Sequence, residues 1–105
     1  MNDIMNPIIK SRRAWFISDG DRIKEHVLFL NVALADAETK MRGNDWRAYE
    51  CKLRCTSEGA PTYAYVITEI EHGYQYIFAA YDNPTTAQVV AQESGLEYNE
   101  WQVVA

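Results

Sequence analysis

The 105-residue chain is 48% hydrophobic and 12% aromatic, a composition that fills the core of one domain and excludes a disordered polypeptide. Its formal net charge is −5, yet all ten Lys and Arg residues lie between Lys10 and Arg54, so residues 55–105 carry seven carboxylates and no permanent positive charge. Because a sequence-independent contact with phosphate needs the opposite sign, this half of the chain disfavours nucleic-acid binding. It fits a solvated surface or a partner rich in Lys and Arg.

The sequence carries no signal for a membrane or for secretion. No apolar run approaches the roughly 20 residues of a membrane span. The N-terminus has neither the apolar stretch nor the small-residue cleavage site of a secretory signal. We therefore expect a cytoplasmic protein that forms a single domain over residues 1–105, with residues 1–9 as a flexible tail.

The first segment with structural character runs from Lys10 to Phe16, where three basic residues precede two large aromatic ones. Two interpretations are open. The segment is either a first strand whose rings enter the core while the bases face water, or an arm that contacts a partner. As candidate partner-binding residues it offers Arg12, Arg13, Trp15 and Phe16.

A long helix is predicted between Asp21 and Gly43. Residues 18–21 offer side-chain oxygens for its N-terminus, Gly43 ends it, and an apolar stripe follows one face. The stripe consists of Ile23, Val27, Leu30, Leu34, Ala37 and Met41. Phe29 lies on the opposite face, which either another part of the chain, such as Trp15, or a second protein has to cover. Phe29 is therefore another candidate contact residue.

From residue 46 onward the apolar period changes to two, which predicts strands. The expected strands cover residues 46–55, 62–71 and 74–81, with a tight turn at His72-Gly73, and should form an antiparallel meander. Asn83-Pro84 begins a short helix that Gly95 ends, and residues 98–104 form a last strand. The predicted fold class is α+β: a long N-terminal helix packed on a three- to four-stranded, mainly antiparallel sheet, with a short second helix.

The sequence contains no recognisable catalytic or metal-binding motif. Cys51 and Cys55 lie on one predicted strand about 13 Å apart, too far to bridge each other or to share one ion. There is no nucleophile elbow, no zinc-binding helix motif and no phosphate-binding glycine loop. We therefore expect a protein that is not an enzyme and that needs no metal or other cofactor.

Two pairs of tyrosines lie on single faces of the predicted hairpin strands, Tyr63 with Tyr65 and Tyr74 with Tyr76. A hairpin that gathers the four rings suits a protein partner, because Tyr buries ring area and hydrogen-bonds at little entropic cost. The other interpretation is that one row packs in the core. Tyr63 and Tyr65 are the candidate contact residues.

A nucleic-acid-binding module is the alternative function. It would use the basic residues of the N-terminal arm and of the strand at residues 46–55 as one patch: Lys10, Arg12, Arg13, Lys52 and Arg54. Direct nucleic-acid binding is the less favoured interpretation, because the tyrosine-rich half has no base with which to build a groove.

The residues Lys-Ser-Arg-Arg-Ala-Trp-Phe at positions 10–16, the predicted helix and the Gly43-Asn-Asp-Trp46 junction resemble the second anti-RecBCD protein of lambdoid Salmonella phages. The resemblance covers most of the chain. It implies a non-enzymatic phage protein of the host bacterial cytoplasm that binds the RecC subunit of the host RecBCD helicase-nuclease. Such binding inhibits or modifies the processing of DNA ends and favours phage recombination.

A second candidate partner is a host prolyl isomerase. The loop around Pro61 places an Ala-Pro bond at the surface, and an exposed bond of this kind can populate the cis form that such enzymes act on. Pro61 is the candidate contact residue for this partner.

Overall fold

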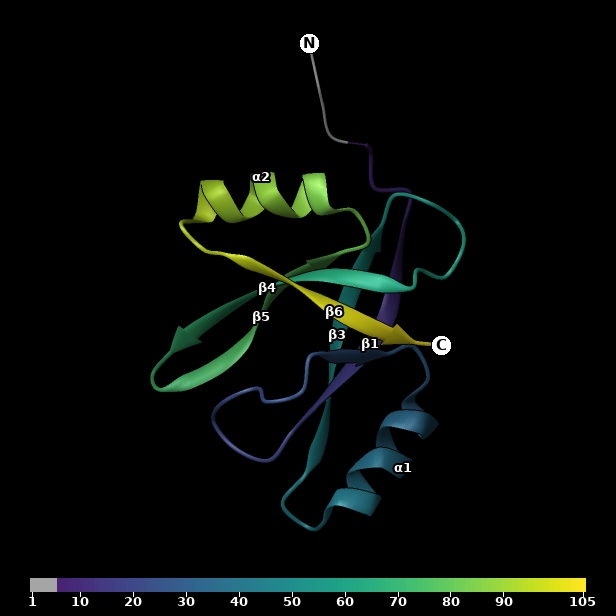
Figure 1. Cartoon of the computed structure of the whole chain (residues 1–105), viewed down its shortest axis with the longest axis vertical. Helices are drawn as coiled ribbons and strands as arrows, with labels where there is room; N and C mark the ends of the chain where they lie inside the picture. Colours follow the sequence, from purple (N-terminus) through teal and green to yellow (C-terminus); the bar gives the residue numbers. More distant parts are fainter. Residues whose placement is uncertain (1–5) are drawn as a thin grey trace.

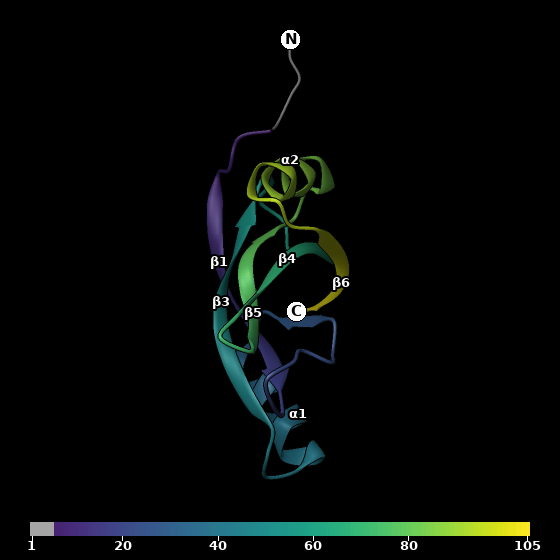
Figure 2. The same ribbon diagram turned by 90° about the vertical axis from the view of Figure 1, so that its left-hand side faces the viewer.

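Six strands close into a barrel in the order β1-β2-β6-β4-β5-β3 within residues 6–105, the part of the chain that the computed structural model describes (Figure 1). The strands are β1 (Lys10–Ser18), β2 (Val27–Phe29), β3 (Arg47–Cys55), β4 (Tyr63–Glu71), β5 (Tyr74–Tyr81) and β6 (Tyr98–Val104), and the helices are α1 (Val32–Arg42) and α2 (Pro84–Ser94). Figure 2 shows β1 and β3 along one side of the molecule, with the two helices at opposite ends. The predicted tail, residues 1–9, lies partly outside the described residues.

The α+β prediction is wrong, and the reason is the segment before α1. Instead of a helix from residue 21, the chain forms a loop and the short strand β2, and Asn31 begins α1 by accepting a hydrogen bond from the Ala33 N–H at 2.8 Å. Leu28 and Phe29 are both buried, on opposite sides of the barrel wall. A strand permits this alternation, and each burial stabilises the fold by about 2 kcal/mol.

The predicted stripe is therefore not the packed face of α1. Leu34 is 41% exposed and Met41 is 81% exposed, whereas Ala35 and Thr39 are buried. The helix spans 11 residues, so it covers a small area of the barrel. The apolar residues of the predicted stripe recur at alternating intervals of four and three residues, but they belong to a loop, a strand and a helix. Their helical spacing is therefore coincidental.

The antiparallel meander is also wrong in its pairing. The hairpin of β4 and β5 forms as predicted, with His72 and Gly73 in positive-φ conformations at its tip. However, β3 pairs along its whole length with β1, from Arg47 opposite Ser18 to Cys55 opposite Lys10. Apolar alternation identifies a strand without identifying its neighbour, and here the neighbour comes from the start of the chain.

The strands predicted at residues 74–81 and 98–104 and the helix between them are confirmed. The Asn83 side chain accepts hydrogen bonds from the N–H groups of Thr85 and Thr86, Pro84 occupies the first turn, and Gly95 ends α2 with φ 70°. These signals are local, so they can be recognised without knowledge of the fold.

Among residues 6–105, three apolar clusters hold the structure together. All six strands contribute to the barrel interior, where Trp101 and Leu53 are among the largest fully buried side chains. On the outside, α2 packs over Ile67 and Ala79, and α1 packs over the cluster of Trp15 and Phe29. The two helices thus cover separate patches of the barrel wall and leave the rest exposed. Neither helix of residues 6–105 is long and apolar enough to cross a membrane.

Candidate functional site

The barrel wall is incomplete between β3 and β5. Within residues 6–105 these strands pair at one position, Arg54 opposite Tyr81, where the Asp82 N–H also donates to the Arg54 carbonyl at 3.1 Å. From Arg47 to Leu53, β3 has β1 as its strand neighbour, and most of β5 has β4. Unpaired strand edges of this kind are uncommon in native proteins unless they are protected or used. We call this region the β3–β5 gap.

The gap contains a pocket of about 230 Å³. Its lining residues come from β1, the loop after β1, β3 and β5: Phe16, Ser18, Gly20, Tyr49, Tyr74, Gln75 and Tyr76. Phe16 and Tyr49 are stacked with their ring centroids 5.3 Å apart. Tyr49 is 44% exposed and Tyr74 is 65% exposed, so two rings are free to meet a partner.

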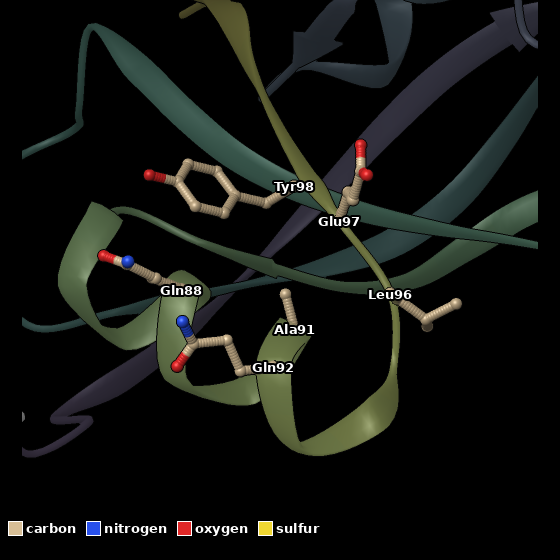
Figure 3. A pocket seen from close by; sticks show the side chains of 6 residues that line it. All are labelled: Gln88, Ala91, Gln92, Leu96, Glu97 and Tyr98. Carbon is tan, nitrogen blue, oxygen red and sulfur yellow. The ribbon is translucent and has the colours of Figure 1, made fainter.

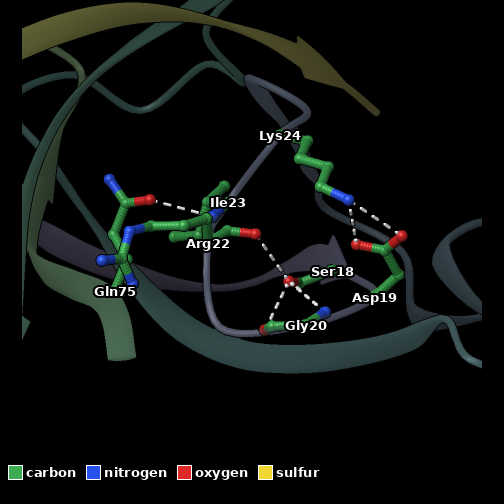
Figure 4. Close-up of polar contacts among 7 residues, drawn as sticks. All are labelled: Ser18, Asp19, Gly20, Arg22, Ile23, Lys24 and Gln75. Atoms are coloured by element: carbon green, nitrogen blue, oxygen red, sulfur yellow. Dashed lines mark hydrogen bonds and ion pairs between the residues drawn. The ribbon is translucent and has the colours of Figure 1, made fainter. Parts of the chain in front are cut away.

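The loop after β1 contributes Gly20 to the pocket, and Ser18 and Gln75 hold this loop in place (Figure 4). The Ser18 hydroxyl lies 3.1 Å from the carbonyl oxygens of Gly20 and Arg22, and it accepts a hydrogen bond from the Gly20 N–H at 3.3 Å. The Gln75 side chain accepts from the Ile23 N–H at 2.8 Å. The Gln75 backbone N–H donates to the Asp21 carbonyl, also at 2.8 Å. The loop is therefore fastened to both β1 and β5.

An acidic hollow of about 570 Å³ adjoins the pocket and shares Gly20, Tyr49 and Tyr74 with it. The hollow adds the carboxylates of Asp19, Asp21 and Asp45 and the guanidinium of Arg47. Asp19 forms an ion pair with Lys24 at 3.0 Å (Figure 4). Asp21 and Asp45 take part in none of the ion pairs among residues 6–105.

Two further carboxylates lie on β4, on the other side of β5 from the gap. The Tyr76 hydroxyl donates to Glu69 at 2.8 Å and also lies 3.2 Å from Glu71. The hydrogen bond to Glu69 is the main cause that raises the pKa of Tyr76 to about 12. The Tyr76 ring is thereby held against β4 in its neutral form.

The structure places the aromatic residues predicted as contacts mostly inside the protein. Trp15 and Phe29 are 8% and 7% exposed and lie opposite each other on β1 and β2, under α1. Phe29 is therefore covered by another part of the same chain, which includes Trp15, and not by a second protein. Phe16 is 8% exposed and reaches the candidate site, because it lines the gap pocket.

The four-ring tyrosine platform does not form. Tyr74 and Tyr76 lie near the tip of the hairpin, whereas Tyr65 lies opposite Tyr81 at its other end. Tyr65 packs edge-on against Tyr98 at 6.1 Å, and Tyr63 is 47% exposed beside β6. Pro61 is half-buried in the loop before β4, and its peptide bond is trans.

The five residues of the predicted basic patch lie on the paired strands β1 and β3, but they do not form one patch. Lys10 and Arg12 lie opposite Cys55 and Leu53 on the interior face of the wall. Arg13, Lys52 and Arg54 lie on the outer face, the face of Trp15. Part of the charge of the five residues is neutralised. Arg13 forms a two-pronged contact with Glu50 at 2.8 and 2.9 Å, which lowers the pKa of Glu50, and Lys10 pairs with Glu58 at 3.5 Å. Arg12 donates to the Glu58 backbone carbonyl at 2.5 Å.

The cysteines are both free and poorly suited to nucleophilic chemistry. Cys55 is buried in the barrel interior and Cys51 is half-buried beside it. Burial, with a smaller effect from Glu50, raises the pKa of Cys51 to about 12. Across residues 6–105 no group of three or more His, Cys, Asp or Glu side chains is placed to hold a metal ion.

Two of the hollows beside the helices can be compared with the gap. One of about 260 Å³ lies between α2 and the start of β6, where Gln88, Gln92 and Tyr98 surround Ala91 (Figure 3). The other, of about 450 Å³, lies beside α1 and is largely apolar, with Leu34 and Met41 in its wall. Neither combines unpaired strand edges with exposed aromatic rings, which the β3–β5 gap does.

Comparison with known proteins does not identify the chain. It matches no protein-family model, no curated protein and no solved structure. The gap residues that sequence reasoning missed are Tyr49, Gln75 and the acidic residues of the loops. Alternation along β3 puts Tyr49 on the same face as Leu53 and Cys55 and therefore predicts its burial. The role of Gln75 depends on contacts between distant parts of the chain.

Proposed function

We propose that this chain is a non-enzymatic protein that binds a partner protein in the β3–β5 gap. One observation supports the proposal: two strands of a barrel diverge and leave unpaired edges beside exposed tyrosine rings. An extended partner segment can hydrogen-bond to such an edge while its side chains contact the rings, which is the mode called β-strand addition. The edge of β3 is the more regular one, because a bulge at Phe78 interrupts β5.

For the partner we propose the RecC subunit of the host RecBCD enzyme, in the bacterial cytoplasm. This target comes from the sequence resemblance to the second anti-RecBCD protein of lambdoid Salmonella phages. Occupation of RecC would inhibit or modify the processing of DNA ends and thereby favour phage recombination. Tyrosine rings beside a free strand edge are a surface of the protein-binding type that this role requires.

The test is binding to purified RecBCD and to RecC alone, measured with the tagged protein on a biosensor. The double variant Tyr49→Ala/Tyr74→Ala removes both exposed rings of the gap. We expect it to weaken binding by at least tenfold, which corresponds to about 1.4 kcal/mol. The matched control is Tyr63→Ala, which removes a ring of similar exposure, 47%, on the part of β4 that pairs with β6.

The outcomes separate the target from the site. Absence of binding to RecBCD and to RecC overturns the proposed target. Tight binding that the gap variant leaves unchanged, or that Tyr63→Ala weakens equally, overturns the proposed site. Circular dichroism and urea unfolding of each variant exclude loss of the fold as the cause of weaker binding.

Three basic residues on the outer face of β1 and β3, Arg13, Lys52 and Arg54, support nucleic-acid binding as a second candidate function. Lys52 and Arg54 take part in none of the ion pairs among residues 6–105, so they are available to phosphates. For this function, affinity for DNA should fall steeply with salt, with a log-log slope of about −0.9 per phosphate contact, and Lys52→Glu/Arg54→Glu should abolish it. Salt-independent or absent DNA binding refutes this candidate.

We also propose a host prolyl isomerase as a second protein partner, recruited at the loop that contains Pro61. The observation in support is that Gly59 and Ala60 are exposed directly before a half-buried proline. The variant Pro61→Ala should reduce recovery of the isomerase in a pulldown from enterobacterial lysate without reducing recovery of RecBCD. Unchanged recovery of the isomerase would contradict the proposal.

A further inference from the structure

We infer that the partner segment in the β3–β5 gap is basic, and that it places a Lys or Arg side chain over the rings of Tyr49 and Tyr74 with its charge facing Asp21 and Asp45. The inference rests on the proposed protein-binding function and specifies the chemistry of the partner. It depends on charge complementarity between this segment and the acidic hollow that adjoins the pocket.

The lining of the acidic hollow is negatively charged once the ion pair between Asp19 and Lys24 is counted. Asp19 is neutralised by Lys24 at 3.0 Å, whereas Asp21 and Asp45 form no ion pair among the described residues. Both are exposed. The Glu69 and Glu71 carboxylates, which accept from Tyr76, lie on β4, across β5 from the gap, and line neither the pocket nor the hollow.

Two arginines in the same region are already engaged with backbone carbonyls. The Arg47 guanidinium donates to the carbonyls of Asn44 and Trp46, at 2.5 and 3.0 Å. The Arg22 guanidinium donates to Gly73 and to the carbonyl of Asp21. Among the residues that line the acidic hollow, Asp19 is paired with Lys24, and Asp21 and Asp45 stand against Arg47. The lining therefore keeps one net negative charge, which disfavours an anionic segment there.

The rings give the cation a defined position. Tyr49 and Tyr74 line both the aromatic pocket and the acidic hollow, so a side chain that crosses from one to the other passes the two rings. A guanidinium or ammonium over an aromatic ring is attracted to its face, and the aliphatic stem of Arg or Lys covers apolar ring surface. An apolar residue would fill the pocket without meeting the carboxylates beyond it.

The experiment titrates ¹⁵N-labelled full-length protein with the blocked pentapeptides Val-Arg-Val-Arg-Val and Val-Gln-Val-Gln-Val and follows backbone amide shifts by NMR. We expect the Arg peptide to shift amides of residues 19–21 and 47–53, and the Gln peptide to bind more weakly at the same sites. The variant Asp21→Asn/Asp45→Asn should weaken the Arg peptide by roughly threefold or more, because each surface ion pair contributes a fraction of 1 kcal/mol.

The matched control is Glu93→Gln/Glu100→Gln, which changes the net charge equally at exposed positions of α2 and β6. It should leave the affinity for the Arg peptide within about twofold of wild type, because screening at physiological salt leaves little interaction beyond about 8 Å. Equal binding of both peptides, equal effects of the two double variants, or no shift with the Arg peptide overturns the inference.

The failure of this inference is distinguishable from failure of the proposed function. If Tyr49→Ala/Tyr74→Ala weakens RecBCD binding but the Arg peptide shows no preference, the gap is a protein-binding site for a segment that is not basic. If the tyrosine variant has no effect on RecBCD while the Arg peptide binds as expected, the gap takes basic segments and the proposed RecC site is wrong.

Discussion

Replacing Asp82 with alanine removes the side chain that fastens the end of β5 to the end of β3. The Asp82 carboxylate accepts hydrogen bonds from the Thr56 backbone N–H at 2.9 and 3.0 Å and from the Thr56 hydroxyl at 2.9 Å. The Ser57 hydroxyl lies 3.4 Å from its second oxygen. These contacts lie next to Arg54 and Tyr81, where β3 and β5 pair.

The expected loss in the free energy of unfolding is about 2 kcal/mol. A partly buried N–H left without its acceptor costs about 1–3 kcal/mol, and a hydrogen bond to a charged group contributes about 1.5–3 kcal/mol net. Both residues are partly exposed, so water recovers some of this energy and the total lies well below the sum. The variant Asp82→Asn keeps one acceptor oxygen and should lose about half as much.

Urea unfolding followed by tryptophan fluorescence measures the effect, because Trp101 is 1% exposed in the folded protein. Asp36→Ala is the matched control: it removes an exposed Asp side chain from α1 and should change stability by less than about 0.5 kcal/mol. If Asp82→Ala and Asp36→Ala unfold at the same urea concentration, the reasoning that Asp82 fastens β3 to β5 is refuted.

Three further predictions concern single side chains. Gln75→Leu should lower the free energy of unfolding by about 1–2 kcal/mol and speed hydrogen exchange of the Ile23 amide, because that partly buried N–H loses its acceptor. The control Gln92→Leu, at an exposed position of α2, should do neither. The wild-type protein should lose stability as pH rises from about 10 to 12. The reason is that the pKa of Tyr76 is raised to about 12, so the unfolded chain releases the Tyr76 proton at lower pH than the folded protein does. Tyr76→Phe should lose less stability over this range, and parallel pH profiles of the two proteins would contradict the prediction. The pKa of Cys51 is raised to about 12, so at pH 8 Cys51 should carry about a thousandfold less thiolate than an ordinary cysteine. Iodoacetamide should therefore label Cys51 far more slowly in the native protein than in protein unfolded in urea, and mass spectrometry measures the two rates.

The parts of the fold that could be predicted from sequence are those with local signals. Asn83 and Gly95 mark the ends of α2, and the His72-Gly73 turn marks the β4–β5 hairpin. The segment before α1 could not be predicted in this way. Its apolar residues match a helical spacing by chance, so the predicted helix runs through Asn31. In the structure Asn31 is the N-cap of a shorter helix. The choice between helix and β2 depends on pairing with β6, far away in sequence.

The candidate site was accessible to sequence reasoning only in part. Phe16 is one of the predicted contact residues and does line the gap pocket. Two other predicted contact residues, Trp15 and Phe29, are buried opposite each other on β1 and β2. Strand alternation indicates which residues share a face, and it does not indicate where two strands diverge. The gap is created by the tertiary arrangement of β3 and β5, so the roles of Tyr49 and Gln75 follow only from the structure.

The parallel pairing of β2 with β6 has a consequence for the kinetics of folding. Val27 to Phe29 lie beside Gln102 to Val104, and Leu30 also donates its N–H to the Val104 carbonyl at 2.8 Å. Closing a chain loop of this length costs entropy before the contacts compensate for it, whereas the β4–β5 hairpin needs only a short turn. We therefore expect the hairpin to form early and the β2–β6 seam to close late, with refolding in milliseconds to seconds in a stopped-flow experiment. Refolding within microseconds would show that this seam does not limit the rate.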